Sequence, residues 1–189
     1  MLPRRFVVRS IPPTQTIMLI ARRCYRRKCL FALAIKSCNT RMVKWVAGLI
    51  NRNYPDSKEA WDRLRGHKAE KSSLAYAAST PPTAKNNGEH MFDTVLWCLK
   101  KAAGNMYDDQ RLEGTNPRPT KKEYVNALLR RELAVTREPR VRGKLSQVSP
   151  LGGAMLQSNQ VLFRRVYDTY VECGGRWNRQ QVLDQLREE

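Results

Sequence analysis

The first 55 residues contain no aspartate and no glutamate, and the first carboxylate of the chain is that of Asp56. Twelve lysine and arginine side chains lie in the same stretch, so their charge is not balanced locally. Charges of one sign at this density repel each other unless an anionic partner lies against them. The lack of acids therefore predicts that this third of the chain lies along a negatively charged surface.

Cysteine and histidine are also scarce. The five cysteines form an odd set without regular spacing or a CxxC pair, which argues against the disulfide framework of a secreted domain and favours a reducing compartment. Cys24, Cys29 and Cys38 come close together, but the only histidines, His67 and His90, are far along the chain. A zinc site needs four suitable ligands. We therefore expect free thiols and no metal.

The sequence lacks the clustered titratable groups of an active site. Gly152-Gly153 and Gly174-Gly175 are not followed by the Lys-Ser/Thr of a phosphate-binding loop, and we expect them to form turns. Asp108, Asp109 and Glu113 are interpreted as a solvated acidic loop rather than a metal cluster. We therefore expect no catalysis, no cofactor and no small-molecule substrate.

A membrane-spanning run is absent as well. The apolar stretches 17–21 and 29–35 are separated by five bases, each of which costs about 2.5–3.5 kcal/mol near a bilayer centre. The first ten residues are rich in arginine, include a serine and lack acids, which is the composition of a mitochondrial targeting segment. We expect the protein in the mitochondrial matrix or at the matrix face of the inner membrane.

What the chain does contain is positive charge. Its 35 bases and 17 acids give a net charge of +18 and a pI near 10.2. Arginine outnumbers lysine, and a guanidinium group matches phosphate oxygens with paired donors. Since twelve of the eighteen excess charges lie before Asp56, the distribution indicates a basic arm joined to a more balanced body.

The hydrophobic pattern predicts an all-α fold of six or seven short helices with proline-rich connections. No apolar/polar alternation exceeds four residues, so strands are not required. Three- and four-residue apolar spacing predicts helices over 17–35, about 41–52, 89–103, 120–136 and 178 onward.

Asp56 or Ser57 is expected to cap a further helix, which restarts after Gly66 towards residue 76, and Ser158 or Asn159 is expected to cap another, which ends at 174. Phe92, Val95, Leu96 and Leu99 form the apolar stripe of the 89–103 helix, and Thr120 and Glu123 have the spacing of a capping box. Residues 105–119 are expected to form a loop. Residues 149–153 are expected to form a break between two helices.

These elements suggest four successive regions. Residues 1–16, which end in Pro12-Pro13 and a threonine, form an extended basic arm. A basic helical segment follows over 17–79, then a linker over 80–88 in which nearly every residue favours turns. Residues 89–189 form the helical body.

Two basic clusters are the main functional signal. Arginines at four-residue steps between 22 and 27 form a ribbon along one helix side, with Tyr25 placed to stack on a base. Residues 137–144 form an irregular basic loop suited to phosphate contacts. The predicted nucleic-acid-binding residues are Arg4, Arg5, Arg9, Arg22, Arg23, Tyr25, Arg26, Arg27, Lys28, Lys36, Arg41, Lys44, Arg137, Arg140, Arg142 and Lys144.

The leading hypothesis is a non-catalytic structural subunit of a ribonucleoprotein, in particular a mitochondrial ribosomal protein that contacts rRNA and neighbouring proteins. The alternative is an accessory subunit of a respiratory-chain or ATP synthase complex whose basic arm lies on anionic lipid. A third interpretation, a free-standing nucleic-acid-binding module, requires the chain to fold alone.

Overall fold

The computed structural model describes residues 30–66, 71–81, 88–112, 119–134 and 149–176. These residues form eight helices and no strand, which confirms the all-α prediction, although the described ranges alone hold more helices than the six or seven expected. The predicted arm, most of the 17–35 helix, the basic loop and the terminal helix lie outside the described residues.

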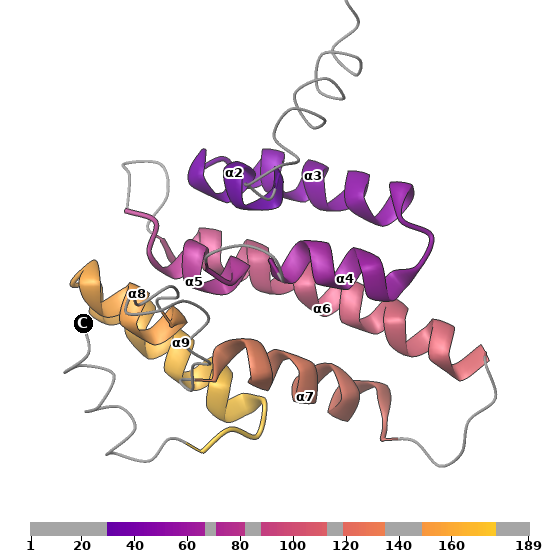
Figure 1. Ribbon diagram of the computed structural model, residues 1–189. Coiled ribbons are helices and arrows are strands. Elements are labelled where there is room, and N and C mark those ends of the chain that lie inside the picture. The colour runs from indigo at the N-terminus through magenta and orange to yellow at the C-terminus, as the bar shows by residue number, and fades with distance from the viewer. Residues whose placement is uncertain (1–29, 67–70, 82–87, 113–118, 135–148, 177–189) are drawn as a thin grey trace, which may run out of the picture.

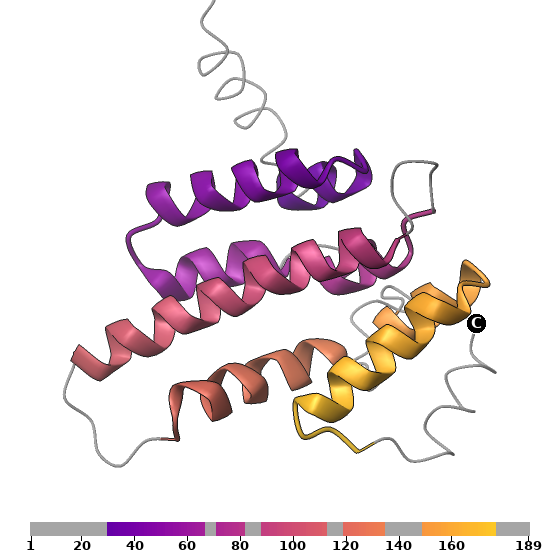
Figure 2. The same cartoon turned by 180° about the vertical axis from the view of Figure 1, so that it is seen from behind.

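The helices stack in three layers (Figure 1). The first layer contains α2 (Leu30–Lys36) and α3 (Thr40–Asn53); the second contains α4 (Ser57–Arg65), α5 (Ser73–Ala78) and α6 (Glu89–Leu112); the third contains α7 (Lys121–Leu133), α8 (Pro150–Leu156) and α9 (Gln160–Glu172). The view from behind shows α6 as the long pink helix that crosses most of the width of the molecule (Figure 2). Helix α6 contacts α3, α4, α5, α7 and α9, so it holds the three layers together.

One continuous apolar core lies on both sides of α6. The predicted α6 stripe is confirmed, because Phe92, Val95, Leu96 and Leu99 are all buried. Side chains from the surrounding helices join this stripe in one core and are themselves fully buried: Phe31, Ile35, Val43, Leu64, Leu129, Leu133, Leu162 and Val166. Each buried side chain of this size contributes about 1.5–3 kcal/mol through the hydrophobic effect.

Polar residues begin most of these helices. The Asp56 side chain accepts a hydrogen bond from the Lys58 amide and so caps α4, and Gly66 ends that helix in the left-handed conformation with φ of 78°. Thr120 and Glu123 form the predicted reciprocal capping box of α7. Of the two residues that the sequence left open as the cap of α9, Ser158 and Asn159, it is Asn159 that caps the helix.

The predicted end of the central helix at Ala103 is wrong. Helix α6 continues to Leu112, so residues 105–112 are helical rather than loop. Gly104 is buried inside the helix, and a β-carbon there would lie 3.1 Å from Lys121 Cε of α7. Gly104 therefore does not terminate α6, and the end of the flexible Lys121 side chain lies against it. As a result, Asp108 and Asp109 lie on a helix and not in the acidic loop that we expected.

The predicted break over 149–153 is also wrong, because these residues begin α8. Ser149 caps the helix by accepting a hydrogen bond from the Gly152 amide, and Pro150 occupies the first turn, where its missing N–H is harmless. A β-carbon on Gly153 would lie 3.1 Å from the Ser79 backbone nitrogen. This glycine lets α8 cross close to α5, so its role is helix packing rather than chain reversal.

Candidate nucleic-acid interface

The structure describes three of the sixteen predicted nucleic-acid-binding residues: Lys36, Arg41 and Lys44. All three lie in the α2–α3 layer and are exposed. The other thirteen lie outside the described residues: Arg4, Arg5, Arg9, Arg22, Arg23, Tyr25, Arg26, Arg27, Lys28, Arg137, Arg140, Arg142 and Lys144.

The α2–α3 layer carries a fourth exposed base, Arg52, which the sequence analysis did not single out. At 100° per residue, Arg41, Lys44 and Arg52 share the side of α3 that lies opposite the buried residues Val43 and Ile50. We call Lys36, Arg41, Lys44 and Arg52 the basic face. No acid occurs between residues 30 and 55 to offset these four charges.

None of the four bases makes an ion pair with a carboxylate that the structure describes. The other two layers differ in this respect: Arg63 pairs with Glu59 at 3.1 Å, and Arg165 of α9 pairs with Asp93 of α6 at 2.9 Å. Lys121 of α7 likewise pairs with Asp108 of α6. The charge of the basic face is therefore available to a partner outside the described chain.

Two of these lysines lie against aromatic rings. The Lys36 Nζ atom is 4.9 Å from the centroid of the Tyr76 ring. The Lys44 Nζ atom is 5.6 Å from the centroid of the Trp97 ring, and the Lys101 Nζ atom of α6 is also 5.6 Å from it. Such cation–π contacts contribute about 0.5–1 kcal/mol at exposed sites. Trp97 is 50% exposed, and we call this ring with its two lysines the Trp97 platform.

The sequence analysis missed Trp97 and Lys101 because both lie in the most apolar helix, more than fifty residues from Lys44. A signal was present, however. Trp97 falls outside the apolar stripe of α6, and Lys101 follows it by four residues on the same side of the helix. Only the packing of α3 on α6 brings Lys44 to the same ring.

Cys98 lies directly beneath the platform and is buried. Burial raises the pKa of its thiol to about 11, although the positive charges of Lys44 and Lys101 oppose this shift. Burial likewise raises the pKa of Cys173. Because the thiolate is the reactive form, the raised pKa lowers the reactivity of both thiols. Both cysteines are buried as part of the core.

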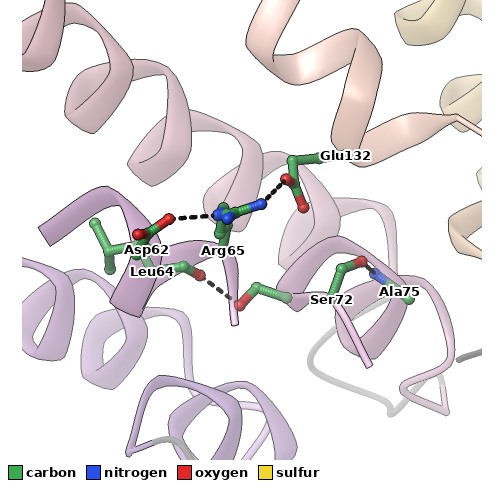
Figure 3. A network of polar contacts seen from close by, with 7 residues as sticks. Asp62, Leu64, Arg65, Ser72, Ala75 and Glu132 are labelled. Atoms are coloured by element: carbon green, nitrogen blue, oxygen red, sulfur yellow. Dashed lines mark hydrogen bonds and ion pairs between the residues drawn. The ribbon is translucent and has the colours of Figure 1, made fainter. Parts of the chain in front are cut away.

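A separate polar network joins α4 to α7 (Figure 3). Arg65 donates to Asp62 of its own helix at 2.7 Å and to Glu132 of α7 at 3.2 Å. Burial raises the pKa of Glu132, and the charge of Arg65 opposes that rise. Burial alone would lower the pKa of Arg65, but its bonds to the two carboxylates outweigh this effect and raise it. The network therefore connects two layers of the fold.

A cavity of about 260 Å³ lies where α3 and α4 meet the second half of α6. Its lining contains amide and carboxylate groups, including those of Asn51, Asn105, Asp108 and Asp109. The carboxylates of Asp108 and Asp109 give this cavity an acidic wall, in contrast to the basic face.

Within the described ranges, no three potential metal ligands come together. No helix of these ranges is both long and apolar enough to cross a bilayer.

Comparison of the chain with protein-family models, curated proteins and solved structures finds no match.

Proposed function

We propose that this protein is a non-catalytic structural subunit of a ribonucleoprotein, in particular a mitochondrial ribosome, and that it contacts RNA through the basic face and the basic segment before it. The observation that carries the proposal is the complete absence of acids from the α2–α3 layer, whose four exposed bases make no ion pair with the described residues. A polyanion supplies the missing countercharge. The inferred partners are rRNA and the proteins that surround it.

The mechanism is charge neutralisation. When lysine and arginine approach phosphate groups, condensed counterions are released, and binding weakens steeply as salt rises. Residues 1–29, which precede α2 in the sequence, contain eight further bases and no acid, so they add to the unbalanced positive charge. Phosphate contacts fix position and orientation without reading the base sequence. The protein thus recognises the backbone and shape of its RNA.

The test measures binding of the full chain to RNA as a function of salt. One variant replaces the basic face (Lys36→Gln, Arg41→Gln, Lys44→Gln, Arg52→Gln). A matched control replaces four exposed bases of the other layers (Lys58→Gln, Lys122→Gln, Arg131→Gln, Arg164→Gln). Both variants lose four charges. At 0.1 M salt we expect the first to bind RNA about 10²–10³-fold more weakly, with a slope against log salt reduced by about 2.8.

The control variant is expected to keep most of the affinity and the slope. Equal losses in the two variants would contradict the proposal, since they would show a response to net charge alone. Vesicles containing cardiolipin test the alternative of a membrane complex. If the basic-face variant loses vesicle binding while its RNA binding is unchanged, the respiratory-chain or ATP synthase alternative replaces the proposal.

A further inference from the structure

We infer that the Trp97 platform is a stacking site for an unpaired nucleobase, with Lys44 and Lys101 contacting the phosphates on either side of that base. This inference rests on the proposed function and specifies the kind of RNA. The ligand is a single strand, a loop or a bulge. A continuous duplex does not fit the site, because its bases are already stacked on each other and do not offer a free face.

The platform is held in place before any ligand binds. Trp97 projects from the middle of α6, and its neighbours Leu96, Cys98 and Leu99 are buried, so the backbone beneath the ring is fixed by the core. Lys101 comes from the same helix and Lys44 from α3. Both ammonium groups lie over the ring in the free protein, so a stacking base displaces at least one of them, which then meets a neighbouring phosphate. A ring that is already positioned loses less conformational entropy on binding.

The charge around the ring indicates an anionic ligand. Two ammonium groups lie 5.6 Å from one ring centroid, an arrangement that brings like charges together at the surface. Asp93 precedes Trp97 by one turn of α6, but its carboxylate accepts a hydrogen bond from Arg165 of α9. The phosphate groups of a bound strand supply the negative charge that the described carboxylates do not supply next to Lys44 and Lys101.

The surroundings of the ring favour nucleic acid over a protein partner. The centre of a protein interface is depleted of charged residues. Trp97 instead has charged neighbours, with Lys100, Lys101 and Lys44 all exposed near it. An aromatic ring combined with a positively charged groove is the usual design of single-strand binding sites, where stacking tolerates any base. Trp45 of α3 provides a contrast: it is 39% exposed, and no cation of the described residues lies over its ring.

The experiment compares two RNAs: a 15-nucleotide oligouridine and a blunt 15-base-pair duplex. Affinities of the full-length protein and its variants are measured by fluorescence anisotropy. For Trp97→Leu we expect oligouridine binding to weaken about 5–150-fold, the range found when a stacking side chain is removed, with duplex binding changed less than twofold. Trp97→Phe retains an aromatic face and should keep most of the affinity. Circular dichroism confirms that each variant is folded.

Tyr167→Leu, at an exposed aromatic of α9 away from the basic face, is the matched control, and it should weaken oligouridine binding less than threefold. A second readout is the tryptophan emission of the wild-type protein, which should be quenched by oligouridine and not by the duplex. In Trp97→Phe this quenching should disappear although Trp45, Trp61 and Trp177 are still present.

Four outcomes overturn the inference. Equal losses for oligouridine and duplex in Trp97→Leu, or equal behaviour of the leucine and phenylalanine variants, would show that stacking is not involved. Unchanged oligouridine binding in Trp97→Leu would show that Trp97 is not a stacking site. Salt-dependent RNA binding, and hence the proposed function, would not be affected by that result. If the wild-type protein binds neither RNA at low salt, the proposed function fails together with the inference.

Discussion

Helix α4 and the α2–α3 layer use the same charged residue types in different ways. In α4 and the aspartate that caps it, three bases lie among three acids, and Arg63 and Arg65 pair with acids of the same helix. In α2 and α3 there are four bases and no acid. The comparison teaches that charge can serve the fold or a partner, and that the presence or absence of interleaved acids distinguishes the two uses.

The largest expected effect on stability comes from breaking a charge pair that serves the fold. Arg65→Gln leaves Glu132, whose side chain is 12% exposed, without its cationic partner. We expect the free energy of unfolding to fall by about 2–4 kcal/mol at pH 7.5, because an uncompensated buried charge is costly. Urea denaturation measures the change. Arg165→Gln removes a more exposed pair between layers and should cost less than about 1 kcal/mol.

The loss of stability in the Arg65→Gln variant should depend on pH. Since burial raises the folded-state pKa of Glu132, the folded protein holds this proton more tightly than the unfolded chain does. Its linked stability is therefore present at low pH and is lost as pH rises through the folded-state pKa. Removing Arg65 raises that pKa further, so the Arg65→Gln deficit should shrink between pH 7.5 and pH 5. A deficit that grows on acidification would contradict this account.

A second prediction adds an acid to the layer that has none. A β-carbon at Gly48 would meet nothing within 4 Å, and residue 48 lies four residues from both Lys44 and Arg52. Gly48→Glu should raise the free energy of unfolding by about 1–1.5 kcal/mol, through higher helix propensity and two new ion pairs. It should also weaken RNA binding, because two bases of the basic face become paired.

Gly48→Ala separates these effects. It should give most of the gain in thermal stability without changing the salt dependence of RNA binding. If instead alanine weakens binding as much as glutamate does, the partner approaches the α3 backbone too closely for a β-carbon. Such a result would sharpen the assignment of the basic face by locating the RNA against the middle of α3.

A smaller effect than that of Arg65→Gln is expected at a helix cap of the third layer. Thr120→Ala removes the side chain that accepts a hydrogen bond from the Glu123 amide and should cost about 1 kcal/mol. The hydrogen bonds from Thr120 lower the pKa of Glu123. The linked stability is thus present at neutral pH and is lost as pH falls through the folded-state pKa. The deficit of Thr120→Ala, measured by thermal unfolding, should accordingly be smaller in acid, and RNA binding should not change.

The sequence predicted the features that depend on local chemistry. The all-α fold, the cap at Asp56, the capping box at Thr120 and the stop at Gly66 all follow from contacts within one turn of helix. The errors came at Gly104 and Gly153. Glycine ends helices, but it also permits close helix packing, and only the position of the neighbouring helix distinguishes the two roles.

The candidate site was predictable only in part for a related reason. Lys36, Arg41 and Lys44 were found because charge imbalance is visible in the sequence, and the structure describes them as exposed. Trp97 and Lys101 were missed because their connection to Lys44 depends on how α3 packs on α6. Their role in RNA binding, like that of the arginines before α2, stays a prediction.

The 24-residue helix α6 also has a mechanical consequence. Trp97 lies near its middle, and Asp108, which holds Lys121 of α7, lies eleven residues further along, a separation of about 16 Å on a straight helix. A strand bound at the ring, as inferred above, would thereby be kept at a set distance from α7. In that case the length of one helix, and not a flexible joint, would determine the spacing between the two.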